Sequence, residues 1–64
     1  MSKVTQTINN VTFTSVTLTD SRILSITLNH KSNRLTVAYA NEVEVVDPAD
    51  DWVWWDHLVA KYIA

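Results

Sequence analysis

Apolar and polar side chains alternate along residues 4–46, and this period of two ends at residue 47. Val, Thr, Ile and Leu dominate the alternating segment, which is the pattern of antiparallel strands with one buried face. Breaks at Asn, Asp and Ser, residues that tolerate turn geometry, divide it into short runs. The sequence therefore predicts an α+β fold in one small domain, residues 1–64. We expect an antiparallel β-meander of four to five strands within residues 4–46, with one C-terminal α-helix (about residues 48–63) packed on one face.

The chain contains no glycine, although tight turns between strands often need a residue with positive φ. Asparagine is the residue that replaces glycine most readily in this region of backbone space. We therefore expect positive φ at Asn10, Asn33 and Asn41.

The parity of apolar residues predicts a register for the best-defined hairpin. The expected pairs are Leu28 with Leu35, Ile26 with Val37, and Leu24 with Tyr39, which places all six side chains on one face. A connection of residues 40–42 would keep Val43 and Val45 on that face and turn Glu44 away from the core. Farther toward the N-terminus the phase changes, which predicts either a β-bulge near Thr14 and Ser15 or a strand that bends into a second pairing.

The segment after residue 47 holds all three tryptophans of the chain. Asp47 suits the helix N-cap and Pro48 the first helical position. At 100° per residue, the side chains that gather on one face are Trp52, Trp55, Val59, Tyr62 and Ile63. We expect this face to cover the sheet, with Leu58 at its margin and Trp54 pointing to the opposite side.

Composition excludes several classes of function. The net charge is −2 and the five basic residues are scattered, so no basic stripe for nucleic acid is present. The sequence has no cysteine and no apolar run long enough to span a membrane, and its first residues lack the apolar centre of a secretory signal. We expect a cytoplasmic protein that binds neither nucleic acid nor membrane.

Catalysis and cofactor binding are not expected either. Asp50 and His57 lie seven residues apart, so their side chains would be roughly 10 Å apart along a helix, too far to share a metal ion unaided. No nucleophile lies at a recognisable spacing from a base, and no glycine-rich loop could cradle a phosphate. The sequence predicts no enzyme activity, no metal and no cofactor.

Protein binding is the remaining class, and the predicted contact surface is centred on the outward tryptophan. Trp54 and Leu58 would form an apolar patch among Asp50, His57 and Lys61, and tryptophan is enriched at interface hot spots. The leading hypothesis is a small accessory or inhibitor protein of a phage or mobile element that binds a larger host protein in the host cytoplasm. The alternative is a structural homo-oligomer that uses the same patch or a sheet edge, and we expect a homodimer.

Overall fold

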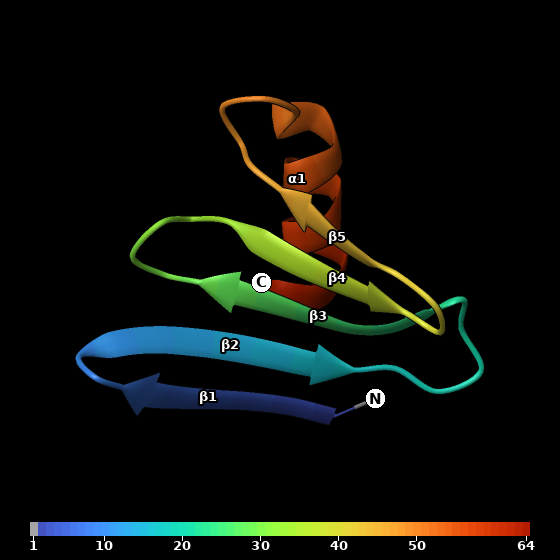
Figure 1. Cartoon of the computed structure of the whole chain (residues 1–64), viewed down its shortest axis with the longest axis horizontal. Helices are drawn as coiled ribbons and strands as arrows, with labels where there is room; N and C mark the ends of the chain where they lie inside the picture. Colours follow the sequence, from blue (N-terminus) through green and yellow to red (C-terminus); the bar gives the residue numbers. More distant parts are fainter. Residues whose placement is uncertain (1) are drawn as a thin grey trace.

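Five strands form one sheet, and a C-terminal helix crosses one of its faces (Figure 1). The computed structural model describes residues 2–64. In chain order, the elements are β1 (Ser2–Ile8), β2 (Val11–Thr17), β3 (Ile23–Asn29), β4 (Leu35–Tyr39), β5 (Val43–Val46), α1 (Trp52–Leu58) and a terminal π-helical turn, η1 (Val59–Ile63). Every neighbouring pair of strands is antiparallel, and the strand order follows the chain. The predicted α+β meander with a C-terminal helix is confirmed.

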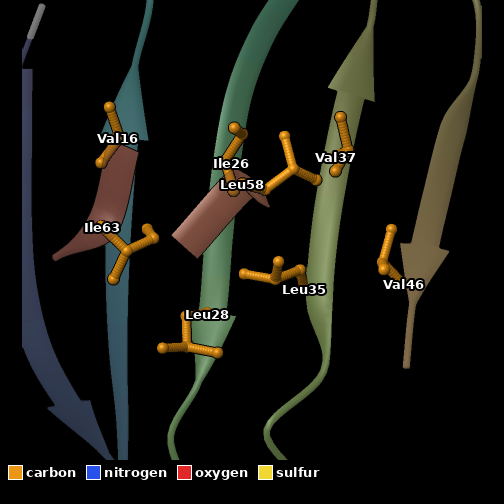
Figure 2. Close-up of a cluster of buried hydrophobic side chains, with 8 residues drawn as sticks. All are labelled: Val16, Ile26, Leu28, Leu35, Val37, Val46, Leu58 and Ile63. Atoms are coloured by element: carbon orange, nitrogen blue, oxygen red, sulfur yellow. The ribbon is translucent and has the colours of Figure 1, made fainter. Parts of the chain in front are cut away.

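The core lies between one face of the sheet, the helix face, and the helix. The buried apolar side chains are Val16, Ile26, Leu28, Leu35, Val37, Val46, Leu58 and Ile63. Figure 2 shows Leu58 between Ile26 and Val37, with Ile63 close to Val16. Because side chains alternate along a strand, the strand residues between these core positions point to the other face of the sheet.

Asparagine and aspartate residues take the place of glycine at the turns. φ is positive at Asn9 (51°), Asn10 (64°), Asp20 (56°) and Asn33 (61°). Two consecutive residues with positive φ form the two-residue turn of the β1–β2 hairpin, a geometry that matches the twist of the flanking strands. The prediction is confirmed for Asn10 and Asn33 and is wrong for Asn41, whose φ is not positive.

The β3–β4 register agrees with the prediction in the middle of the hairpin and departs from it at one end. Leu28 pairs with Leu35 and Ile26 pairs with Val37, as predicted. A bulge between Ile23 and Ser25 then shifts the pairing, so that Tyr39 pairs with Ile23 and not with Leu24. The bulged Leu24 is 45% exposed and does not contribute to the core.

The β4–β5 connection places β5 in the opposite phase to the predicted one. Ala38 pairs with Val43, and the N–H of Tyr39 donates to the carbonyl oxygen of Glu42 (2.9 Å). Val43 and Val45 consequently point away from the helix and are 64% and 62% exposed. Their predicted place in the core is wrong.

In the observed register Glu44 lies on the helix face, whereas the predicted register turned it away from the core. It pairs with Val37 across β4 and β5, but β5 is an edge strand, so the carboxylate reaches the margin of the core. There its Oε1 accepts hydrogen bonds from the Tyr39 hydroxyl (3.2 Å) and from Trp54 Nε1 (3.4 Å). An acidic residue is tolerated on this face because it stays exposed and has donors.

The predicted bulge near Thr14 and Ser15 is also wrong, because β2 pairs with both neighbours without a register shift. Thr14 therefore lies on the helix face and is buried, whereas Phe13 lies on the other face. The Thr14 hydroxyl has two partners, Thr5 Oγ1 at 3.2 Å and His30 Nε2 at 2.7 Å. These hydrogen bonds offset the cost of burying a polar group.

The helix begins at Trp52, and a separate turn precedes it. Asp47 forms this turn: its carbonyl oxygen accepts the N–H of Asp51 (3.0 Å) and its Oδ1 accepts the N–H of Ala49 (2.9 Å). Asp51, and not Asp47, is the N-cap of α1, because its Oδ1 accepts the N–H of Trp54 (3.2 Å).

The packed side of the helix agrees with the prediction in part. Trp55, Val59 and Tyr62 pack against the core and Ile63 is buried, as predicted, whereas the places of Trp52, Leu58 and Trp54 differ. Leu58 is buried, and Trp54 and Trp55 are partly buried on either side of it. Trp52, predicted to face the core, is 66% exposed. Figure 1 shows the reason: α1 begins beyond β5 and crosses the strands toward β3, so its first turn has no sheet beneath it.

The π-helical turn brings a second anchor into the core. The N–H of Ala64 donates to the carbonyl oxygen of Val59 (2.8 Å), five residues back. In an ideal α-helix Leu58 and Ile63 would point about 140° apart. The wider turn of η1 returns Ile63 toward the side of Leu58, and both are buried.

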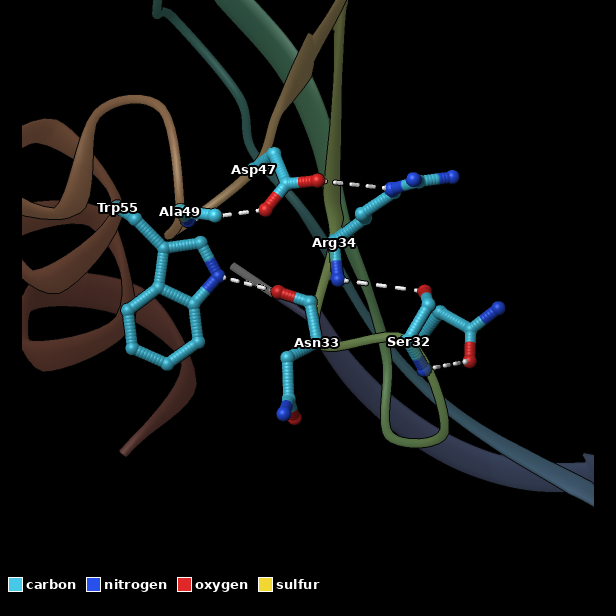
Figure 3. A network of polar contacts seen from close by, with 7 residues as sticks. Ser32, Asn33, Arg34, Asp47, Ala49 and Trp55 are labelled. Atoms are coloured by element: carbon cyan, nitrogen blue, oxygen red, sulfur yellow. Dashed lines mark hydrogen bonds and ion pairs between the residues drawn. The ribbon is translucent and has the colours of Figure 1, made fainter.

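Polar contacts link the β3–β4 turn to α1 and to the segment that precedes it (Figure 3). Trp55 Nε1 donates to the carbonyl oxygen of Asn33, and Arg34 Nε donates to Asp47 Oδ2 at 3.0 Å in an ion pair. The hydrogen bond from the Ala49 N–H, together with the Arg34 guanidinium, lowers the pKa of Asp47 below its ordinary value.

Replacing Leu58 should be far more damaging than replacing Trp52. Leu58→Ala should cost about 2–5 kcal/mol of unfolding free energy, comparable with the ~3–5 kcal/mol that a core of this size provides. Trp52→Ala should change stability by about 1 kcal/mol or less, because the indole is largely exposed. Urea denaturation followed by circular dichroism compares the two, and equal losses would contradict the observed helix orientation.

The ion pair at Asp47 predicts a pH-dependent contribution to stability. A carboxyl group whose pKa is lowered by folding stabilises the protein above its unfolded pKa of about 3.9, and this stabilisation disappears as pH falls through the folded pKa. Asp47→Asn should therefore lower the urea midpoint at neutral pH and leave it unchanged at about pH 2. A decrease in the urea midpoint of the same size at both pH values would show that the charge of Asp47 does not contribute to stability.

Candidate protein-binding surfaces

The structure does not bring the predicted contact residues Trp54, Leu58, Asp50, His57 and Lys61 into one exposed patch. Leu58 is only 1% exposed and belongs to the core, so a partner cannot contact it. Asp50, His57 and Lys61 are exposed, and Trp54 is partly buried. The apolar centre of the predicted surface is therefore missing, while a binding role for the remaining four residues stays a prediction.

Trp54 makes contacts within the chain on several sides. It packs against the hydrophobic core, and its ring stacks on His57 with centroids 5.7 Å apart and planes inclined by 12°. Its Nε1 donates to Glu44 Oε1. These contacts hold the indole in place and leave it less accessible than expected for a hot spot on the outer side of the helix.

Trp52 and Val53, and not Trp54, form the exposed apolar surface of the helix. They are 66% and 63% exposed, at the end of α1 that projects beyond β5. Helical periodicity alone does not identify these two residues as exposed. It ranks the sides of a helix by their apolar content and does not show how much of the helix lies over the sheet.

An open hollow of about 710 Å³ lies beside Trp54. Its lining residues are Ser21, Arg22, Ile23, Tyr39, Glu42, Val43, Glu44 and Trp54. The Arg22 guanidinium carbon lies 5.7 Å from the centre of the Tyr39 ring, and the Tyr39 hydroxyl donates to Glu44. Burial and the Glu44 carboxylate raise the pKa of Tyr39. The phenol is therefore protonated at neutral pH and serves as a hydrogen-bond donor, not as a nucleophile.

Residues 2–64 contain no group of three or more His, Cys, Asp or Glu side chains placed to hold a metal ion. Within the same residues, no helix is both long and apolar enough to cross a membrane.

On the face of the sheet opposite the helix, the open face, none of the strand residues within 2–64 is charged. Its strand residues are Ser2, Val4, Gln6, Ile8, Val11, Phe13, Ser15, Thr17, Ser25, Thr27, Asn29, Thr36, Ala38, Val43 and Val45. Exposed apolar residues line both margins, with Val4 (53%) and Ile8 (51%) on β1 and Val43 and Val45 on β5. The middle strands carry mostly small side chains together with Phe13, and the hydroxyls of Ser15 and Thr27 are 3.1 Å apart and share a hydrogen bond.

The charges of the molecule lie elsewhere, although the chain has five basic and seven acidic residues. Lys3 and Glu44 point to the helix face, and Arg34 and Asp47 neutralise one another where β4 begins and β5 ends. The others lie in loops and on the helix. A solvated sheet face usually carries polar and charged residues, so a surface of this width without a charge is suited to being covered.

A scan against protein-family models and searches of curated proteins and of solved structures found no match to this chain.

Quenching of tryptophan fluorescence should distinguish the three indoles. Trp52 is the most exposed, so Trp52→Phe should remove the emission that iodide quenches most strongly. Trp54→Phe should leave that component in place. The reverse result would mean that Trp54, and not Trp52, faces solvent.

Proposed function

We propose that this protein is a protein-binding domain that contacts its partner through the open face. The observation that supports this is that no strand residue within 2–64 is charged on a surface that spans all five strands, with exposed Val4 and Ile8 at one margin and exposed Val43 and Val45 at the other. A charged side chain must lose its hydration when an interface forms, which costs free energy unless it is paired. Interface centres are accordingly depleted of charged residues.

The dimensions of the open face are compatible with a specific contact. Five strands about 4.8 Å apart, each with about six residues at ~3.4 Å, give a surface of roughly 24 by 20 Å, or about 500 Å² per partner. Both partners together would bury about 1,000 Å², which is below the ~1,200–2,000 Å² of stable specific interfaces and in the range of weak or transient ones. A transient or regulatory contact fits this size better than an obligate one.

A foreign protein is the partner that we favour, as in the hypothesis of a small phage or mobile-element accessory protein that inhibits or adapts a host protein in the cytoplasm. The small size of the chain and its lack of a recognisable catalytic constellation support a role exerted by contact. The exposed Trp52 and Val53 offer a second, smaller contact at the end of the helix.

Site-specific photo-crosslinking in the cells that encode the chain tests this proposal. A photoreactive residue at Thr36, on the open face, should yield a discrete crosslinked product larger than two copies of the chain. The same residue at Ala60, exposed on the helix, should not. Crosslinking from Ala60 alone would place the partner on the helix and refute the proposal.

Once the crosslinked partner is identified, its affinity can be compared between two variants that each add one positive charge. Val45→Lys alters the open face, and Ala60→Lys alters the helix. The first should weaken binding at least thirtyfold, about 2 kcal/mol, while the second should leave affinity within about twofold. Equal effects would show that the open face is not the contact surface.

A further inference from the structure

Strand β1 leaves one of its two edges unpaired. It is the outermost strand of the sheet, bonded only to β2, and all seven of its residues are exposed (Figure 1). β5 at the opposite edge has four residues and runs directly into the turn at Asp47 and Pro48. β1 therefore offers the longer and more regular free edge.

The hydrogen bonds of β2 show which backbone groups of β1 point outward. The Thr12 carbonyl oxygen accepts the N–H of His30, so Thr12 directs its backbone toward β3 and not toward its β1 partner, Thr7. Because this direction alternates along an antiparallel pair, the N–H and C=O groups of Lys3, Thr5 and Thr7 all face away from β2.

This edge lacks the features with which proteins usually prevent edge-to-edge pairing. Such features are proline, bulges, very short strands and charged side chains along the edge. β1 contains no proline, pairs with β2 without a register shift, and has one charged residue, Lys3. The Lys3 ammonium group is turned over the helix face, where it donates to the carbonyl oxygen of Ile63 at 2.6 Å.

We propose that β1 pairs antiparallel with β1 of a second copy of the chain, across a two-fold axis at Thr5, and joins the two sheets into one. In this register Thr5 lies opposite the second copy's Thr5, Lys3 lies opposite Thr7, and Val4 lies opposite Gln6. Every outward N–H and C=O group of the three edge residues then has a partner. This interface goes beyond the proposed function because it uses the strand edge and leaves the open face free.

Charge and side-chain chemistry favour a second copy over an unrelated strand. The two Lys3 residues would be separated by four residues of strand, about 14 Å, which exceeds the Debye length at physiological salt. On the helix face, the hydroxyls of Thr5 and Thr14 are hydrogen-bonded, as are those of Thr7 and Thr12. Antiparallel self-pairing would continue this threonine row across the axis, where Thr–Thr pairs are favourable.

The oligomeric state of proline variants tests the proposal. Thr5→Pro removes only an outward N–H, so the chain should keep its circular dichroism spectrum and sediment as a monomer under conditions in which the wild-type chain is a dimer. Gln6→Pro is the matched control in the same strand: it removes an N–H that points to β2, and it should instead damage the fold.

A charge variant keeps the test decisive if Thr5→Pro fails to fold. Thr5→Lys places two ammonium groups side by side at the axis, and should raise the dimer dissociation constant at least tenfold. Ala60→Lys adds the same charge on the helix and should leave the constant unchanged. Hydrogen exchange adds a residue-level measurement, because the amides of Lys3, Thr5 and Thr7 should be protected at least tenfold more in the dimer than in the Thr5→Lys monomer.

A monomeric wild-type chain, or a dimer that survives both Thr5→Pro and Thr5→Lys, would overturn the edge-pairing proposal. A dimer that is broken by Val45→Lys but not by the Thr5 variants would mean that two copies pair through their open faces, which also overturns it. The crosslinking result at Thr36 is independent of these outcomes, so failure of the proposed function and failure of the edge dimer can be told apart.

Discussion

The packing of Leu58 against Ile26 and Val37 joins the two layers of this molecule. A chain of 64 residues has enough apolar side chains for one core, and the buried ones of this chain lie between one face of its sheet and the helix. The single helix closes that face, and within residues 2–64 the other face is not covered by a helix. The open face is therefore a direct consequence of how the core is built.

The direction of the helix explains the other exposed features. Because α1 crosses the strands, its first turn projects beyond β5 and leaves Trp52 without a surface to cover. At the other end, η1 lies over β2, and Lys3 of β1 donates a hydrogen bond to the carbonyl oxygen of Ile63. Strand β1 is consequently held by its backbone pairing with β2 and by threonine hydrogen bonds to it, and its outer edge is the one on which we propose self-pairing.

Strand topology could be predicted from the sequence because the alternation is long and the turn residues are distinctive. The pairing of Ile26 with Val37 follows from parity alone. Parity could not determine the length of the β4–β5 connection, and one residue of difference exchanged the faces of Glu44 and Val45. The bulge at Leu24 contains no glycine, and its only trace in the sequence is the pair of adjacent apolar residues Ile23 and Leu24.

The prediction of exposed contact residues on the helix lacked one kind of information, namely which part of the helix lies over the sheet. A helical wheel ranks the sides of an isolated helix, and on that basis Trp52 and Trp55 outweigh Leu58. In the folded chain Leu58 is instead buried against the sheet. Trp54 stacks on His57 and donates a hydrogen bond to Glu44. No single residue marks the open face in the sequence, because its absence of charge becomes visible only when the strands are set side by side.

The most direct measurement of the one-sided core compares two neighbouring residues of β4. Thr36 points to the open face and is exposed, whereas Val37 is fully buried under the helix. Urea unfolding of Thr36→Asp and Val37→Asp places the same carboxylate on the two faces. We expect Thr36→Asp to fold with a stability within about 1 kcal/mol of the wild-type chain, and Val37→Asp to lose cooperative unfolding altogether, because an unpaired charge would be buried. Similar losses for the two variants would show that both faces are covered, and would contradict the account.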